Sequence, residues 1–535
     1  MIRSSYAFIN LLKATVGVGV FAMPMALKQA GFWTGLILSV GIGIINAHGM
    51  MKIVSCSQYL CKRKQMSNIR ANRNGATIRP VCLDAQYIKA VTDEEQSHTS
   101  EETISKEGAD EERSRVYTIE TESEKVMVEG TVEKRFTLDY GGMAAEAFTS
   151  TRSRTLRMFG KPSMIFVNAC IIGLQLGICS AFYIFVVDHA KEALDYMLTK
   201  DLSRNMLFFT ALPFFILIAN VSNMTLLSWI GLLGNVLLAI STVIIYVHLI
   251  MKDNHLPISK LPVFTNVEGA SLAAGCIIYS YTGQGVLLGL ESKMQKPKKM
   301  LGFFGVISTA MGTVTLLNTV TGLLGYITYG EDLEGSITLN LSNEPLHFSV
   351  KIMLLVMTYL SYPVVMYPIV DMFFPFIERR IRHTKRHVVT LSHYVFRYVV
   401  VLISFALAYV IPNFKDILPL IGTLTGTILA IFFPPLLHMV VFLKKWKKGN
   451  TVKLVWNMTH NVIYLVLSIV LLVVDAECRV CEQRDYGELK AHLFDYHWNH
   501  ELLPSNLSQK DCQKAYASQL YMASFTAQKC SVDDV

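Results

Sequence analysis

Apolar runs of about 20 residues, bounded by polar or charged positions, recur along the chain, and this is the length that an α-helix needs to cross a bilayer. The pattern predicts eleven such spans. They cover residues 14–30, 32–54, 163–187, 205–221, 225–250, 269–290, 302–328, 349–374, 395–412, 417–442 and 457–474. The run at 205–221 is the shortest, and the first run, counted from residue 5, is the most interrupted.

Composition places the chain among membrane proteins. Of its 535 residues, 52% are hydrophobic and only 17% are charged, whereas an average soluble domain is about 25% charged. A secretory signal peptide is an alternative explanation for the first run, but Lys13 and Pro24 lie inside that run and Lys28 lies near its end. We therefore expect an all-α integral membrane protein that retains its first span.

Lysine and arginine are concentrated in alternate loops. The basic loops are 62–80, 152–161, 293–299, 378–386 and 444–453, and the loops between them are poor in arginine. With eleven spans, a cytosolic N-terminus places every basic loop in the cytosol, in agreement with the positive-inside rule. The formal net charge of +8 follows from this asymmetry, so the expected surroundings are a lipid bilayer and not nucleic acid. The odd number of spans puts the C-terminus outside the cell or in a lumen.

One insertion interrupts the spans and divides the chain into four parts. These are the first two spans in 1–61, the insertion 62–136, the remaining spans in 137–475 and a tail at 476–535. The insertion starts basic and becomes acidic and rich in serine and threonine, a composition with too little apolar surface to pack. We expect it to be disordered and cytosolic. It is either a regulatory segment, whose partners the sequence does not identify, or a passive loop.

The tail carries four cysteines, Cys478, Cys481, Cys512 and Cys530. In an oxidising compartment they indicate two disulfides, with three connectivities open. A zinc site built from the first two cysteines and two later histidines is the alternative, but the interval between the pairs is shorter than in a zinc finger. Asn506 and Asn340 begin acceptor sequons on the same side of the membrane and are candidate glycosylation sites.

Two glycine pairs interrupt spans in corresponding places of the two halves of the chain. They are Gly17-Val18-Gly19 in the first span and Gly283-Gln284-Gly285 in the sixth. Glycine weakens a helix, and an opened backbone at membrane depth is tolerated only where it lines a cavity or is buried in protein. Matched breaks are typical of the binding site of an inverted-repeat secondary transporter. The alternative is that membrane helices are simply rich in glycine.

The breaks indicate how a small zwitterion binds. The N–H groups of Gly17, Val18 and Gly19 would face its carboxylate at the start of a half-helix, and a β-carbon at either glycine would obstruct that approach. Carbonyl groups of the second break would face its ammonium group. The predicted substrate-binding residues are Thr15, Gly17, Val18, Gly19, Tyr279, Ser280, Tyr281, Thr282 and Gly283. The two tyrosines either close over the ligand or serve as packing residues.

Among the ionisable side chains inside the spans, two are candidates for charge coupling. Lys13, one turn before the first break, either supplies a fixed positive charge or extends its ammonium group to the cytosolic interface. His48 in the second span either titrates or is a hydrogen-bonded structural residue. The sequence contains no Walker A, HExxH or GxSxG motif. We therefore expect neither an enzyme nor an ATP-driven pump, and no catalytic residue, cofactor or bound metal.

Five segments in a fixed order carry a family resemblance. They are FINLLKATVGVGVFAMPMALKQAG, NAHGMMKIVSCSQYL, NACIIGLQLGICSAFYIFVVDHAK, YSYTGQGVLLGLESKMQKPKKM and GYITYGEDLEGSITLNL. With them the chain resembles the amino acid/auxin permease family, and within it the proton-coupled amino acid transporter branch. The resemblance covers nearly all the spans and leaves out the insertion and the tail. It implies a LeuT-type fold of two inverted five-helix repeats plus an eleventh helix, alternating access, and small neutral amino acids as substrates.

Two positions depart from that branch. Asn10 stands where the branch usually has a histidine, and Thr282 stands where many members have a glutamate. Without these protonatable groups proton coupling is an open question, and we expect sodium-independent uptake with weak pH dependence. The loops 188–204 and 329–346 contain no cysteine, so a disulfide between them, expected in parts of the family, cannot form.

The sequence therefore predicts a multi-pass transporter of amino acids, either secondary-active or facilitative, in the plasma membrane or a lysosomal or endosomal membrane. A non-transporting amino acid sensor on the same fold and a channel-like facilitator are the alternatives. Flux in proteoliposomes separates a transporter from a sensor, because a sensor binds without net flux.

Overall fold

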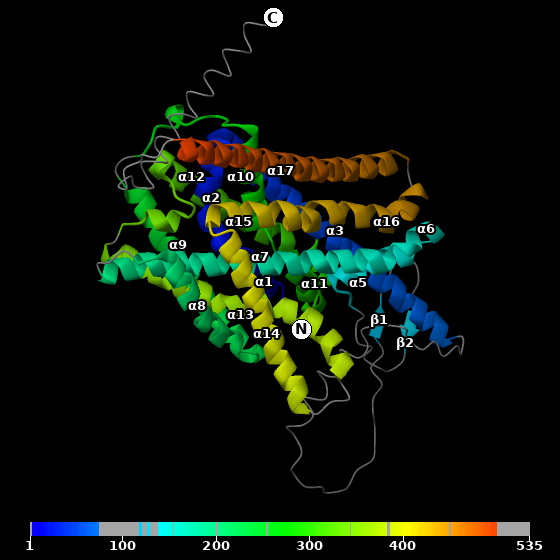
Figure 1. The fold of residues 1–535 in the computed structure, drawn as a ribbon. Coiled ribbons are helices and arrows are strands. Elements are labelled where there is room, and N and C mark those ends of the chain that lie inside the picture. The colour runs from blue at the N-terminus through cyan, green and yellow to red at the C-terminus, as the bar shows by residue number, and fades with distance from the viewer. Residues whose placement is uncertain are drawn as a thin grey trace, which may run out of the picture. The chain divides into compact units, whose positions relative to one another are not determined.

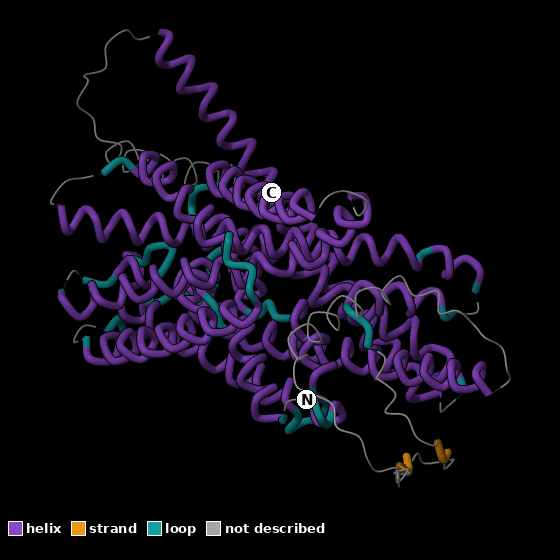
Figure 2. Tube along the Cα trace, turned by 90° about the horizontal axis from the view of Figure 1, so that it is seen from below, coloured by secondary structure: helices purple, strands orange, loops and turns teal. Residues whose placement is uncertain are grey.

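The computed structural model describes residues 3–73, 117–119, 126–128, 137–151, 153–198, 202–252, 255–342, 344–381, 386–448 and 451–499. In this part of the chain almost all regular structure is helical (Figure 1, Figure 2). The chain divides into two compact units, Met1–Asp475 and Ala476–Val535. The helices that bear on function belong to the first unit.

The helices follow the order of the predicted spans. In the first half of the chain they are α1 (Ser4–Thr15), η1 (Val18–Ala22), α2 (Met23–Ala30), α3 (Phe32–Arg73), α5 (Tyr140–Thr149), α6 (Arg154–Met158), α7 (Gly160–Leu198), α8 (Arg204–Ala219) and α9 (Met224–Met251). In the second half they are α10 (Val267–Ser280), α11 (Gln284–Lys293), α12 (Val306–Tyr329), α13 (Pro345–Ile381), α14 (Arg386–Val410), α15 (Phe414–Ile421), the π-helical turns η6 (Gly422–Gly426) and η7 (Ile428–Phe432), α16 (Phe433–Lys447) and α17 (Thr451–Asn499). Short 3-10 turns lie at Ile258–Lys260, Pro297–Met300, Gly330–Asp332 and Ile337–Asn340.

Length and composition identify the membrane-crossing helices. Within the described residues eight helices are long and apolar enough to span a bilayer, and α1 with α2 makes a ninth candidate that bends by 50° at the first glycine pair. α8 is a shorter apolar helix of 16 residues, and α10 and α11 are short helices on either side of the second glycine pair. The protein is therefore a helical, multi-pass membrane protein.

Glycine brings helices into close contact at a few crossings. A β-carbon at Gly422 in η6 would overlap the carbonyl oxygen of Gly275 in α10, so these two backbones touch. A β-carbon at Gly49 in α3 would lie 2.5 Å from the carbonyl oxygen of Ala430 in η7. Such contacts are favoured in membranes, because lipid is as apolar as the side chains and close packing has to drive association. The tenth span is thereby held against both α3 and α10.

The helix α3 continues to Arg73, into the segment 62–136 that the sequence assigns to the insertion. The segment 62–73 contains no glycine or proline and is rich in lysine and arginine, which favour a helix. Further along, two short strands, β1 (Tyr117–Ile119) and β2 (Val126–Val128), pair antiparallel where the sequence predicts disorder. Their valine, isoleucine, threonine and tyrosine residues favour strands. The rest of the insertion lies outside the described residues.

Candidate functional site

The first break separates α1 from α2. Val16 and Gly17 have extended backbone conformations, and a 3-10 turn over Val18–Ala22 then leads into α2. Within the described residues the N–H groups of Gly17, Val18 and Gly19 donate no hydrogen bond to the protein. Unsatisfied N–H groups at the start of a helical segment favour a negatively charged ligand. These are the donors that the sequence assigns to a carboxylate, and the assignment itself stays a prediction.

The second break, Tyr281–Gly283, separates α10 from α11. Carbonyl groups at this break already accept hydrogen bonds from protein side chains. Thr282 Oγ1 donates to the carbonyl oxygen of Tyr279 at 2.8 Å, and Asn46 Nδ2 donates to that of Tyr281 at 3.1 Å. Because a carbonyl oxygen has two lone pairs, an ammonium group would share these acceptors with the protein.

Tyr281 is a packing residue in this structure. Its side chain is completely buried, and its hydroxyl donates to the carbonyl oxygen of Ser39 in α3 at 3.1 Å. Tyr279 is also buried, with its ring against Gly19. Both side chains are packed in the protein, and their closing over a ligand stays a prediction.

The two breaks are in direct contact. Ser280 Oγ donates to the carbonyl oxygen of Gly19 at 3.0 Å. A β-carbon at Gly283 would lie 2.7 Å from Thr15 Oγ1, so the end of α1 faces the start of α11. The predicted substrate residues, although about 260 positions apart in sequence, therefore meet in one place.

The two glycines of the first break have different surroundings. A β-carbon at Gly19 would lie 2.8 Å from Ser280 Oγ and 3.1 Å from Ser280 Cα, whereas a β-carbon at Gly17 would meet no heavy atom within 4 Å. The sequence suggests the same steric role for both residues, and the structure does not show this. Gly19 is required for packing of the first break against the second, and only Gly17 borders open space.

Two amide side chains that the sequence analysis missed hold the second break to α3. Gln284 Nε2 donates to Asn46 Oδ1 at 2.8 Å, and Gln284 Oε1 accepts from the N–H of Gly283 at 3.1 Å. Both side chains are buried. With the bond from Asn46 to Tyr281, the amides connect α3 to each side of the break. A polar Asn46 inside an apolar run, and a glutamine between the two glycines, were the signals available in the sequence.

The two candidate charge-coupling residues lie apart from each other. Lys13 is half-buried in the last turn of α1, and no carboxylate of the described residues pairs with it. His48 Nδ1 lies 3.1 Å from the hydroxyl of Tyr464 in α17, on a side of α3 different from the one where Asn46 contacts the break. His48 is thus hydrogen-bonded, as one of its two interpretations requires, and it does not contact the break.

Other predicted sites are only partly described. Asn340 lies in a 3-10 turn, where its Nδ2 donates to the carbonyl oxygen of Asp332 at 2.8 Å and its Oδ1 accepts from the N–H of Glu334 at 3.0 Å. Cys478 lies on α17. The side chain of Cys481, and all of Cys512, Cys530 and Asn506, lie outside the described residues. The disulfides and the glycosylation therefore stay predictions.

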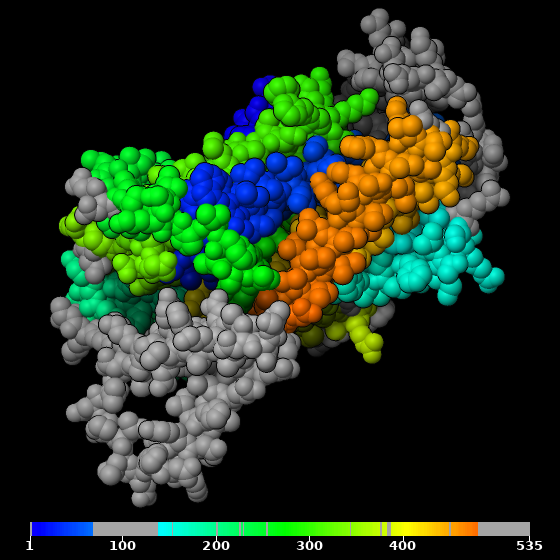
Figure 3. Space-filling view, turned by 90° about the horizontal axis from the view of Figure 1, so that it is seen from above, coloured from blue at the N-terminus to red at the C-terminus, as the bar shows by residue number. Residues whose placement is uncertain are grey.

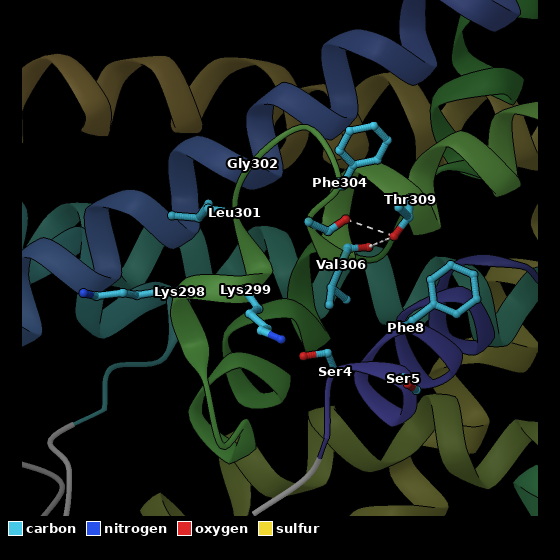
Figure 4. Close-up of a pocket in the computed structure, with 11 residues that line it drawn as sticks. Ser4, Ser5, Phe8, Lys298, Lys299, Leu301, Gly302, Phe304, Val306 and Thr309 are labelled. Atoms are coloured by element: carbon cyan, nitrogen blue, oxygen red, sulfur yellow. Dashed lines mark hydrogen bonds between the residues drawn. The ribbon is translucent and has the colours of Figure 1, made fainter.

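Two cavities lie away from the breaks. One, of about 750 Å³, opens at the first turns of α1 and α12, where Ser4 and Phe8 face Lys299 and Thr309 (Figure 4). The other, of about 450 Å³, lies between α7 and α13 beside the ion pair of Glu192 and Lys351, whose atoms are 3.2 Å apart. Neither is lined by a residue of the breaks.

Known proteins are similar to this one along most of the chain. The family model described as transmembrane amino acid transporter protein matches residues 2–92 and 123–475. A probable amino acid transporter of Caenorhabditis elegans, skat-1, is 27% identical over 450 residues, which cover 84% of this chain and 82% of that protein. The proton-coupled amino acid transporter-like protein pathetic of Drosophila melanogaster is 28% identical over 312 residues, which cover 57% of this chain and 62% of that relative.

Proposed function

Because the chain belongs to the transmembrane amino acid transporter protein family, we propose that it carries small neutral amino acids across a membrane through a site at the two helix breaks. One observation carries this proposal. The three N–H groups of the first break lack acceptors in the described protein, and Ser280, next to the second break, donates a hydrogen bond to the carbonyl oxygen of Gly19 in the first break. Donors for a carboxylate and shared acceptors for an ammonium group therefore occur together.

The pairing of half-helices supports a LeuT-type fold with alternating access. α2 packs against α10, and α1 packs against α11. According to the positive-inside rule, the first span runs from the cytosol outward and the sixth runs back toward the cytosol. α2 and α10 are then the outer halves of these two spans, and α1 and α11 are their inner halves. The outer halves of the first and sixth spans therefore pack against each other, and so do their inner halves, although the two spans run in opposite directions. This is expected for two inverted five-helix repeats, with α17 as an eleventh helix. We place the N-terminus in the cytosol and the C-terminus outside or in a lumen, in a plasma, lysosomal or endosomal membrane.

The composition of the breaks supports a neutral substrate and sodium-independent transport. No residue in 15–19 or 279–285 is charged, so a charged substrate side chain would have no counter-ion there. The ammonium group of Lys13, one turn from the first break, repels a sodium ion nearby. Asn10 and Thr282 do not exchange protons near neutral pH, so tight proton symport is not expected from the residues at the breaks.

The test is uptake of radiolabelled small neutral amino acids into proteoliposomes that contain the full chain. We expect saturable exchange that is independent of sodium and that an imposed pH gradient does not make concentrative. Binding without flux would identify a sensor instead of a transporter. Concentrative uptake that requires sodium would show that Lys13 does not take the place of a cation. Concentrative uptake that is driven by protons and persists in His48→Ala would contradict weak proton coupling. It would also show that His48 is not the residue that couples transport to protons.

A further inference from the structure

Four basic side chains and one tyrosine lie together where α3 meets α16 and α17. They are His48 and Lys52 on α3, His438 on α16, and His460 and Tyr464 on α17, and we call them the basic cluster. The ring of His48 lies 4.6 Å from that of His460, and the ring of His460 lies 4.7 Å from that of Tyr464. Lys52 Nζ lies 4.2 Å from the centre of the Tyr464 ring. In Figure 3 the orange surface of the C-terminal helices borders the blue surface of the N-terminal helices.

The basic cluster carries too many positive groups for its surroundings. Lys52 is only 3% exposed, and its Nζ has no hydrogen-bond partner among the described residues. The charged or titratable neighbours that act on the cluster from α3, α16 and α17 are its own members and Cys56, and no described carboxylate is among them. Like charges this close in a membrane interior cannot all be present together. Protonation of one member therefore opposes protonation of the others.

An acceptor for one further proton is already in place. Asn461 Nδ2 lies 3.4 Å from His438 Nδ1, while the buried Asn461 Oδ1 has no partner among the described residues. Asn461 Nδ2 also donates to the carbonyl oxygen of Asn457 at 2.7 Å, so a half-turn of this amide that presents Oδ1 to His438 exchanges that bond for the new one. A proton on His438 Nδ1 would then have an acceptor.

The helix α3 connects the basic cluster to the proposed substrate site. His48 and Lys52 are four residues apart and share one side of α3, and Asn46 and Met50 share another side. Asn46 holds Tyr281 and Gln284 of the second break, and a β-carbon at Gly283 would lie 3.3 Å from Met50 Cε. A charge on the first side therefore acts on a segment of α3 whose other side holds the second break through Asn46.

The basic cluster is also within reach of one membrane face. His438 precedes Lys447, the last residue of α16, by nine positions, and His460 follows Thr451, the first residue of α17, by nine positions. Both intervals correspond to about 14 Å along a helix. The C-terminal end of α16 carries Lys444 and Lys445, and the positive-inside rule places this end in the cytosol.

We propose that His48, Lys52, His438, His460 and Tyr464 form a proton-binding site that sets the rate of amino acid transport from the cytosolic side. This proposal rests on the proposed function. It assigns the proton a regulatory role at a distance from the substrate, so it is compatible with transport that a proton gradient does not drive. It replaces the weak pH dependence that the residues at the breaks suggest with a rate that depends on pH.

The experiment measures the initial rate of amino acid exchange in proteoliposomes, with equal pH on both sides, for the wild type, His438→Gln with His460→Gln, and Lys52→Met. His393→Gln is the matched control, because His393 is a half-buried histidine of α14 that contacts Phe374 and lies outside the basic cluster. Burial and positive neighbours oppose protonation of the histidines of the basic cluster, so we expect the wild-type rate to change about tenfold between about pH 4 and pH 6.5. The rate of the double variant should change by less than about twofold over the same range. Removing the charge of Lys52 makes the histidines easier to protonate. The midpoint of the rate profile of Lys52→Met against pH should therefore lie about one pH unit above that of the wild type. The control should keep the wild-type profile.

Several results would overturn the proposal. They are a flat wild-type profile, a double variant with the wild-type profile, an unmoved midpoint in Lys52→Met, or an equally altered control. If the wild type binds amino acids but does not exchange them, the proposed transport fails, and the pH dependence of the dissociation constant in the same variants then tests the basic cluster by itself. Histidine-selective nitrogen-15 NMR of the same preparations reads protonation without any substrate. Histidines that titrate independently of one another in those spectra would contradict a shared site.

Discussion

The two glycines of the first break differ in what a single methyl group would do. At Gly17 the backbone is extended, with φ −136°, and an added β-carbon meets no heavy atom within 4 Å. We expect Gly17→Ala to fold normally and to weaken amino acid binding about tenfold, because the methyl group occupies the space beside the three N–H donors. Gly19→Ala should lower thermal stability instead, since its β-carbon would be forced against Ser280.

Binding of a radiolabelled amino acid to purified protein, read together with the thermal unfolding midpoint, separates these two effects. Wild-type affinity in Gly17→Ala would exclude the first break from the substrate site. An unchanged unfolding midpoint in Gly19→Ala would show that the contact between the two breaks is looser than the structure indicates.

Asn46 is expected to stabilise the second break, because loss of its side chain leaves two buried polar groups without a hydrogen-bond partner. In Asn46→Leu, Gln284 Nε2 and the carbonyl oxygen of Tyr281 lose their partner in a buried place, at a cost of about 1–3 kcal/mol each. We expect a lower unfolding midpoint together with weaker substrate binding. Asn457→Leu is the control, since Asn457 Nδ2 donates only within its own helix, to the carbonyl oxygen of Lys453. Equal losses in the two variants would argue against a specific role of Asn46 at the break.

The sequence predicted the place of the breaks but not how they are held. Adjacent glycines are visible in one chain, and their effect on a helix is local. The bond from Asn46 to Tyr281 joins residues 235 positions apart, and the bond from His48 to Tyr464 joins residues 416 positions apart. Such contacts are set by helix packing, which hydrophobic periodicity does not determine. For the same reason the opposite surroundings of Gly17 and Gly19 could not be inferred.

The crossing of α10 and η6 depends on the absence of side chains at two positions. A β-carbon at Gly422 would overlap the carbonyl oxygen of Gly275 and lie 2.9 Å from the backbone nitrogen of Tyr279. No rotamer change relieves a clash with backbone, so Gly422→Ala should destabilise the protein by about 1–3 kcal/mol or more. Gly312→Ala in α12, where a β-carbon meets nothing within 4 Å, should be neutral or slightly stabilising. Thermal unfolding of both variants in the same detergent is the measurement, and equal midpoints would contradict the close crossing.

The helices were predicted better than their irregular parts. Each expected apolar run falls for most of its length on one helix or on consecutive helical segments of the structure. The run at 417–442, however, contains the π-helical turns η6 and η7, which the sequence analysis did not predict. They follow Pro419, which has no backbone N–H to donate, and Thr423 Oγ1 donates to the carbonyl oxygen of Pro419 at 2.8 Å. A proline in an apolar run is visible in the sequence, but the turn that forms after it depends on the close approach of α10.

The arrangement of the whole molecule in the membrane depends on the number of crossings. α1 with α2, α8, and α10 with α11 are the three elements that do not count as single long apolar helices, so the odd number rests on reading each of them as one span. Each contains or adjoins a feature that explains its shortness: a glycine break in two cases and Pro213 inside α8 in the third. An error in any one of them would move the C-terminus to the other side of the membrane.

Glycosylation of Asn506 would show directly on which side of the membrane the C-terminus lies. If the C-terminus lies outside or in a lumen, the Asn506-Leu-Ser sequon is glycosylated, and Asn506→Gln removes a glycosidase-sensitive shift in gel mobility. Asn340 should contribute less, because its amide is engaged on both sides by backbone groups of its own loop. Asn457, in the second turn of α17 near its basic end, should contribute nothing because the same topology places it in the cytosol. A shift that survives in Asn506→Gln, or a C-terminal tag that antibodies reach only from the cytosol, would mean an even number of spans and would require one of the broken or short elements to be a re-entrant segment.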